Sequence, residues 1–135
     1  MKPTKNPTQK KIKKLQHQAD LLFYAVVCRL HPQCLVCEIN KAQTGHHFIY
    51  KSQSATLRYD LRNGIPICNS CHCRHHQSGD PAVVDTIIRK KGLEWANEMY
   101  RIKKIISKKY KGISYYEDVI RELNMKLTEC NLKGI

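Results

Sequence analysis

The chain has 135 residues, the size of one ordinary domain, and its 24 Lys and Arg outnumber its 11 Asp and Glu, which gives a net charge of +13 with neutral His. No stretch approaches the roughly 18–20 apolar residues that span a bilayer, and no secretory signal is evident, so we expect a protein without membrane segments that works in the cytoplasm. In that compartment the seven Cys predict metal ligands or free thiols before disulfides.

The positive charge is concentrated in two blocks. Residues 1–14 hold six Lys and no acid, and residues 89–111 hold nine Lys or Arg against two Glu. The segment between them and residues 112–135 are close to balance. Two basic blocks on either side of a neutral centre are typical of a surface that binds a polyanion. A solvated basic surface without a partner would have the same composition.

The N-terminal part of the chain predicts a basic arm followed by one long helix. Residues 1–10 are rich in Lys, Pro and Thr and predict a disordered arm. From about Thr8, apolar side chains recur at steps of three and four and form one stripe. Because His31 precedes Pro32, whose ring disfavours helical backbone in the preceding residue, we expect the helix to end near Leu30.

The segment that follows contains no helical period. Short apolar runs predict two strands, at residues 45–50 and 64–67, and then a helix from about Ser70 or Cys71. The sequence therefore predicts an α+β fold, with a compact core at residues 34–76, one helix before it and several helices after it.

Two further helices are expected next. Asp80 can cap the first of them, with Pro81 at its first position and Gly92 at its end. The second is expected from Leu93 to Tyr110. Its inward side chains are predicted to be Trp95, Ala96, Met99, Ile102, Ile105 and Ile106.

The last helix is expected to begin at Ser114, because Glu117 three residues later completes a capping box. The apolar residues of the C-terminal helices either pack on the domain itself or form the surface of a homodimer. We divide the chain into the arm at 1–10, a domain at 11–111 and a C-terminal helix at 112–135. The apolar residues in question are Ile102, Ile105, Ile106, Val119, Ile120, Leu123 and Leu127.

Cysteine spacing is the strongest chemical signal. Cys34 and Cys37 form one Cys-x-x-Cys pair, and Cys68 and Cys71 form another. Each pair places two thiolates on one tight turn, and two pairs supply the four soft ligands of a closed tetrahedral zinc site. Chance or a redox-active pair could explain one such motif, but two in one short chain favour structural zinc.

Five of the seven His fall in two groups near these pairs, His46-His47 and the set His72, His75 and His76. His72 and His76 are four residues apart, so on a helix they lie on one face. Together with a His of the first group they could bind a second metal ion, since a site closed by four Cys has no open position for chemistry. Spacing does not decide between His75 and His76, and clustered His can also be ordinary loop residues.

The order His-His, then Asn63, then Cys-x-x-Cys-His-x3-His resembles the His-Asn-His (HNH) nuclease superfamily and its ββα-metal motif. In that family a His pair or an acid-His pair lies on the first strand, an Asn lies in the hairpin loop and a His opens the helix. The stretches Cys34-Leu-Val-Cys37, Leu57-Arg-Tyr-Asp60 and Gly92-Leu-Glu94 are also similar to phage recombination endonucleases of the NinG/Rap type. The resemblance implies a zinc-stapled, treble-clef-like ββα-metal core between Cys34 and His76.

The resemblance also implies a function and roles for residues. The chain would be a metal-dependent endonuclease that hydrolyses DNA phosphodiester bonds, at branched or recombination intermediates of phage or prophage DNA in the host cytoplasm. His47 would be the general base, and Asn63 would hold the loop and orient it. His46, His72 and His76 would bind one divalent ion, Mg, Mn, Ni or Zn. His46 stands where most members have Asp, and imidazole ligands favour borderline transition metals.

Basic residues near this core are expected to bind DNA phosphates. The alternative is a non-catalytic, zinc-stabilised module that binds nucleic acid. That alternative explains the four Cys and the charge of +13, but leaves the ordered His and Asn set without a role. The expected phosphate contacts are Arg58, Arg62, Lys90, Lys91, Lys103 and Lys104.

Overall fold

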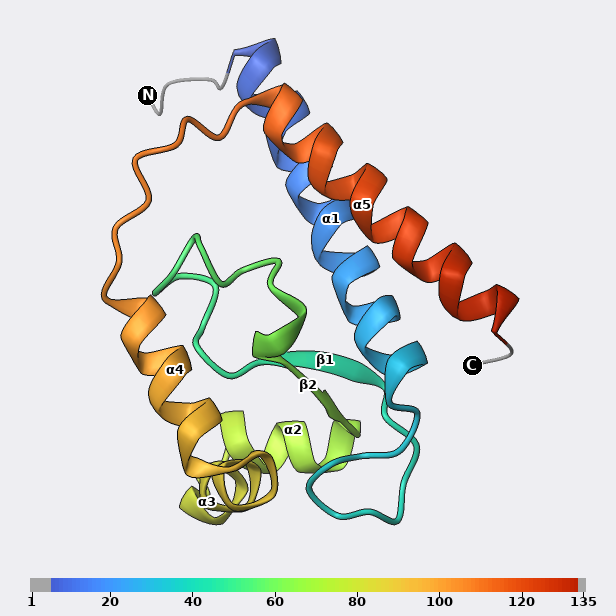
Figure 1. Cartoon of the computed structure of the whole chain (residues 1–135), viewed down its shortest axis with the longest axis vertical. Helices are drawn as coiled ribbons and strands as arrows, with labels where there is room; N and C mark the ends of the chain where they lie inside the picture. Colours follow the sequence, from blue (N-terminus) through green and yellow to red (C-terminus); the bar gives the residue numbers. More distant parts are fainter. Residues whose placement is uncertain (1–5, 134–135) are drawn as a thin grey trace.

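The computed structural model describes residues 6–133 and confirms a mixed architecture of helices around one small sheet (Figure 1). No helix in this described range is both long and apolar enough to cross a membrane. In chain order the elements are α1 (Pro7–Leu30), β1 (Thr44–His47), the 3₁₀-helix η1 (Leu61–Asn63), β2 (Gly64–Ile67), α2 (Asn69–His76), α3 (Pro81–Lys91), α4 (Leu93–Lys103) and α5 (Ile113–Leu132).

Helix α1 begins earlier than the sequence predicted. The side chain of Asn6 accepts a hydrogen bond from the Gln9 backbone N–H at 2.8 Å, the Gln9 side chain accepts one from the Asn6 N–H, and Pro7 occupies the first position. Residues 7–10 are therefore helical, and only the first five residues of the expected arm lie outside the described range. The helix ends at Leu30, as expected.

The sheet is one antiparallel pair on which α1 lies at close range. His46 pairs with Ile65 and His47 with Gly64. A Cβ on Gly64 would lie 2.4 Å from Val27 Cγ2, so only glycine lets the strand approach α1 this closely. Strand β2 has the predicted bounds, whereas β1 ends at His47 instead of residue 50, because the chain turns there into a loop.

The helices after the sheet match most of the bounds predicted from the sequence, apart from the end of α4. Helix α2 begins at Asn69, one residue before the earlier of the two predicted starts. Helix α3 has Asp80 as its cap, Pro81 at its start and Gly92 at its end, as predicted. Helix α4 ends at Lys103, so the prediction of a helix to Tyr110 is wrong.

The early end of α4 also corrects two core assignments. Ile105 and Ile106 are exposed, although their spacing continues the apolar stripe of α4. Figure 1 shows the reason, since residues 104–112 run as an extended connection from the end of α4 to the far end of the molecule, where α5 begins. Local periodicity cannot report the distance that such a connection has to span.

Helix α5 runs alongside α1 in the same direction (Figure 1). Gln16 Nε2 donates to Tyr116 Oη at 3.1 Å near the start of α5, and Arg29 Nη2 donates to Asn131 Oδ1 at 2.7 Å near its end. Leu123 joins the α1 core across the boundary expected at residue 112. The capping box predicted at Ser114 is wrong, because Gly112 precedes the helix and no side chain caps it.

An apolar groove remains between α1 and α5, with a volume of about 800 Å³. Leu15, Ile120, Met125 and Leu132 contribute to its lining. The homodimer expected through the C-terminal helices stays a prediction.

Candidate active site

The four cysteines of the two pairs converge on one point. The Sγ atoms of Cys34, Cys37, Cys68 and Cys71 all lie within 4.8 Å of one another, and Cys37 and Cys68 are 4.0 Å apart. A tetrahedral zinc ion with Zn–S bonds of about 2.3 Å requires Sγ atoms roughly 3.8 Å apart, so the donor set and its spacing fit structural zinc.

The surroundings of the thiols favour metal binding. The backbone N–H groups of Asn40 and Ile39 donate to Cys37 and lower the pKa of this thiol to about 6. The side-chain amide of Asn40 also donates to Cys68 Sγ at 3.6 Å. Burial raises the pKa of Cys71 to about 12, a penalty that a bound zinc ion would reverse because it binds the thiolate.

Lys90 contacts the turn that carries the first Cys pair. Its Nζ donates to the carbonyls of Leu35 and Val36 at 2.6 and 3.2 Å and lies 2.8 Å from Glu38 Oε1. The side chain is mostly buried. These three partners already bind the ammonium group, and its predicted contact with a DNA phosphate stays a prediction.

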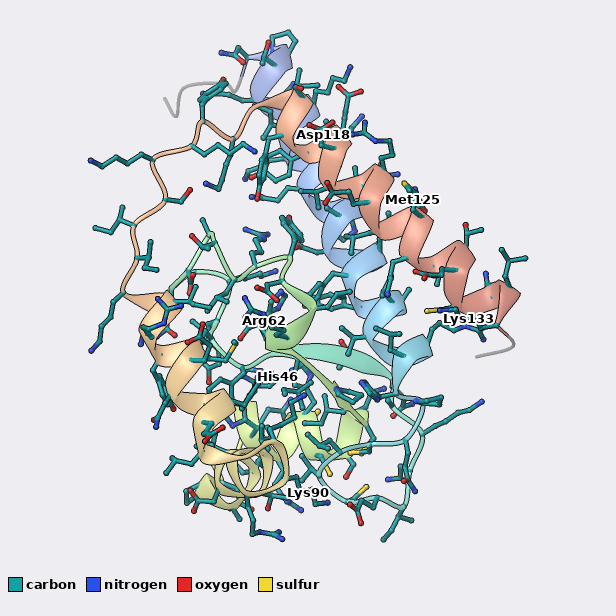
Figure 2. All side chains as sticks on the ribbon, in the orientation of Figure 1. His46, Arg62, Lys90, Asp118, Met125 and Lys133 are labelled. Carbon is teal, nitrogen blue, oxygen red and sulfur yellow. The ribbon has the colours of Figure 1, made fainter. Side chains whose placement is uncertain are left out.

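A second group of metal donors lies on the other side of α2. One ring nitrogen each of His46, His72 and His76 come within 4.8 Å of one another. His46 comes from β1, whereas His72 and His76 are one turn apart on α2. His46 lies at the centre of Figure 2, between α2 and α4. Three imidazoles that face one another without a carboxylate form a donor set for a borderline metal ion such as Zn²⁺ or Ni²⁺.

Burial favours the neutral, metal-binding form of the His46 ring. Removal from water, together with the neighbouring His72, His75 and His76, lowers the pKa of His46 to about 3. The ring is therefore neutral at physiological pH, and a neutral imidazole is the form that binds metals.

The structure separates His75 from His76, which the sequence could not do. His75 Nε2 lies 2.8 Å from Tyr50 Oη, so one of its ring nitrogens already has a hydrogen-bond partner. His76 belongs to the three-His group instead. His75 still borders the group, with its ring centroid 4.9 Å from that of His46.

His47 points to the opposite face of the sheet from His46. Its ring stacks on Phe23 of α1 with centroids 4.7 Å apart and planes within 8°. Its Nε2 lies 2.8 Å from the carbonyl oxygen of Arg58. A carbonyl can only accept, so Nε2 carries the proton and Nδ1 has a free lone pair. Burial lowers the pKa of His47, which keeps the ring neutral.

Asn63 is fully buried and holds the loop that follows His47. Its Oδ1 accepts from the Ile49 N–H at 2.7 Å, and its Nδ2 donates to the carbonyls of Ile49 and Leu57 at 2.9 and 3.3 Å. These bonds tie together the two ends of the loop, next to His47 and next to Arg58. These hydrogen bonds go to the backbone of the loop, so they would act on the His47 ring through the backbone.

Arg58 is engaged in an internal ion pair, and its predicted contact with a DNA phosphate stays a prediction. Its Nε and Nη2 donate to Asp20 Oδ1 and Oδ2 at 3.0 and 2.7 Å, and both side chains are largely buried. Burial alone would raise the pKa of Asp20, but the hydrogen bonds and charge of Arg58 hold it below its ordinary value of 3.8. Asp20 was not predicted as a site residue, and its one signal in the sequence is an acid within the apolar stripe of α1.

The other basic residues predicted to bind DNA differ in their exposure and in the contacts that they already make. Arg62 is exposed and pairs with Asp60 at 2.7 Å. Lys91 lies 5.3 Å from the centre of the Trp95 ring, a cation–π contact on the surface. Lys103 and Lys104 are exposed at the end of α4.

A cleft of about 340 Å³ brings the two kinds of histidine together. His46, His47, His72 and His76 all line it. Lys51, which the sequence analysis did not single out, lines it too, and its Nζ lies 3.7 Å from Asp20 Oδ2. The cleft therefore combines three metal donors, a neutral imidazole with a free lone pair and a cation.

Comparison with known proteins bears on this same segment. Residues 34–78 match the family model of HNH endonucleases. This match supports the HNH superfamily. A curated relative named Anaredoxin, from Nostoc sp. (strain PCC 7120 / SAG 25.82 / UTEX 2576), is 39% identical over 46 residues, which are 33% of this chain and 58% of that relative. The chain thus spans less than two thirds of the length of the relative it matches. No solved structure matches the chain.

Proposed function

We propose that this protein is a metal-dependent HNH endonuclease that hydrolyses DNA phosphodiester bonds. In this proposal β1, β2 and α2 form the ββα-metal module. One observation carries it: His47 lines the same cleft as His46, His72 and His76, whose ring nitrogens lie within 4.8 Å of one another.

His47 would act as the general base. Its Nε2–H is held by the Arg58 carbonyl, so the ring is fixed in orientation and tautomer and only Nδ1 can take a proton from water. The ring is neutral because burial lowers its pKa. Asn63 would keep the Arg58 carbonyl in place through its bonds to the two ends of the loop.

His46, His72 and His76 would hold one divalent ion, whose contribution is to stabilise negative charge on the phosphate and on the leaving oxygen. Mg, Mn, Ni and Zn are all candidates, and the all-imidazole donor set favours the last two. The four-Cys site would hold zinc for structure only, because its four ligands close the coordination sphere.

The substrate is proposed from charge and resemblance. Exposed Lys and Arg would hold flanking phosphates without reading sequence; Lys51 lines the cleft, Lys103 lines the hollow beside His46, and Arg62 is exposed elsewhere on the surface. Branched or recombination intermediates of phage or prophage DNA in the cytoplasm remain the proposed natural substrate, on the resemblance to NinG/Rap-type enzymes.

A non-catalytic zinc module that binds nucleic acid is the second candidate, because the four-Cys site and the charge serve it equally well. Cleavage separates the two. The purified protein should nick or cut DNA when Mg, Mn, Ni or Zn is supplied, and His47→Ala should abolish cutting while zinc content and DNA binding stay unchanged. His17→Ala, at an exposed position on α1, is the matched control and should cut normally. A wild-type protein that binds DNA but cuts no duplex, flap or junction with any of these metals would favour the non-catalytic module.

A further inference from the structure

The connection between α4 and α5 is rich in cations. From Lys103 to Lys111 the sequence reads KKIISKKYK, five Lys in nine residues with no acid. Residues 103–110 are all exposed, and Lys111 is partly exposed. Figure 2 shows side chains of this segment projecting into solvent, away from the helices.

The charges of this segment are not neutralised within the protein. Among residues 6–133, none of the five Lys lies within 4.0 Å of a carboxylate. Lys111 Nζ donates to Ser107 Oγ at 2.8 Å, and Lys109 and Lys111 lie 5.4 Å from the centre of the Tyr115 ring. These contacts hold the segment in shape and leave its charge for an external anion.

Three large apolar or aromatic side chains stand exposed between these lysines. Ile105 is 51% exposed, Ile106 85% and Tyr110 83%. An exposed aromatic ring within a cationic strip is the combination that proteins use for unpaired nucleic acid, because lysines follow the backbone and rings stack on bases. A duplex offers such rings nothing, since its bases are already stacked on one another.

The strip is continuous with the candidate active site. Lys103, its first residue, lines a hollow of about 240 Å³ together with His46, His75, Tyr50 and Tyr100. Both tyrosines are partly exposed, and Tyr100 is three residues before Lys103 on the same face of α4. The exposed rings of Tyr50 and Tyr100 therefore lie between His46 and the lysine strip that leads to Tyr110.

We propose that this path, from the hollow beside His46 along residues 103–111, binds single-stranded DNA. Its lysines would contact phosphates and Tyr110 would stack on an unpaired base. The inference deepens the proposed nuclease function, because it selects DNA with an unpaired segment next to the cut as the substrate class. Binding itself does not depend on cleavage, so the two proposals can fail separately.

Fluorescence anisotropy on the full chain carrying His47→Ala tests the path, with a labelled oligodeoxythymidine and a blunt duplex of equal length. Stacking of one base contributes about 1–3 kcal/mol, so Tyr110→Ala should weaken single-strand binding about 5- to 150-fold. Tyr110→Phe should bind like the parent, and duplex binding should be unchanged by either variant.

The lysines are tested by Lys108→Gln with Lys109→Gln. The charge-matched control is Lys41→Gln with Lys126→Gln, because these two lysines lie outside both basic blocks. The strip variant should lower the slope of log K against log salt by about 1.4 for the single strand, at about 0.7 for each lost contact, and the control should not. The inference is overturned if Tyr110→Ala leaves the affinities for single strand and duplex unchanged, or weakens both equally. It is also overturned if the strip variant and the control variant change the salt slope by the same amount. A protein that binds single strands as described but never cuts would refute the nuclease and leave the path standing.

Discussion

Asp20→Asn tests how the candidate general base, His47, is held in position, without changing the His47 side chain. Asp20 accepts both hydrogen bonds from Arg58, and the carbonyl of Arg58 holds His47 Nε2 at 2.8 Å. The substitution keeps the shape of the side chain and removes its charge. It therefore leaves the largely buried Arg58 guanidinium without its counter-ion, on the same residue whose backbone carbonyl orients His47.

The size of the effect follows from burial. The side chain of Asp20 is 8% exposed and that of Arg58 is 18% exposed. Breaking a buried pair by removing one partner destabilises a protein by about 3–5 kcal/mol, and because Arg58 keeps some access to water we expect about 3 kcal/mol. The Arg62–Asp60 pair in the same loop has similar geometry but is much more exposed, so Asp60→Asn should lose at most about 1 kcal/mol.

Urea unfolding of wild type, Asp20→Asn and Asp60→Asn measures these losses, and single-turnover cleavage measures the consequence for His47. A shift of the Arg58 carbonyl of the order of 1 Å should slow cutting by up to about 100-fold with zinc content unchanged. Equal losses of stability in the two variants would refute the reasoning about burial. A large loss of stability with an unaltered cutting rate would show that the pair does not position His47.

The stabilisation that the Arg58–Asp20 pair contributes should be lost in acid and not in base. Arg58 holds the folded-state pKa of Asp20 below 3.8, so the stabilisation is complete above that pH and is lost as the pH falls through the folded-state pKa. The stability difference between wild type and Asp20→Asn should therefore be constant near neutral pH and shrink below pH 3.8. A difference that grew on acidification would contradict the assignment.

Three other substitutions test the framework around the site. Cys68→Ser should release the structural zinc and broaden the unfolding transition, as metal analysis and urea unfolding would show, whereas exposed Cys73→Ser should retain the ion. Asn63→Ala should strip the loop's buried backbone groups of their partners, lose about 2–4 kcal/mol in urea unfolding and abolish cutting; an active, stable variant would disprove its role. Gly64→Ala should lose about 1–3 kcal/mol, because its Cβ would lie 2.4 Å from Val27 Cγ2, and an unchanged urea midpoint would mean that α1 yields at this point.

The sequence by itself determined the features that depend on residues a few positions apart, namely the cysteine pairs and the helix caps. Two Cys-x-x-Cys pairs are typical of one four-thiol site, and their Sγ atoms do converge. Asp80, Pro81 and Gly92 set the bounds of α3 because caps act within a single turn. The core segment and the donor types of both metal clusters followed from such local rules.

Only the tertiary structure decided which of these groups meet and which charges are free. The sequence predicts Arg58 and Lys90 as phosphate ligands, yet Arg58 pairs with Asp20 on α1 and Lys90 donates to the carbonyls of Leu35 and Val36. Ile105 and Ile106 continue a helical period, yet the chain must extend there so that α5 can pack beside α1. Spacing along the chain fixes contacts within a turn or two, whereas partners tens of residues apart are fixed by how the elements pack, and no local pattern carries that information.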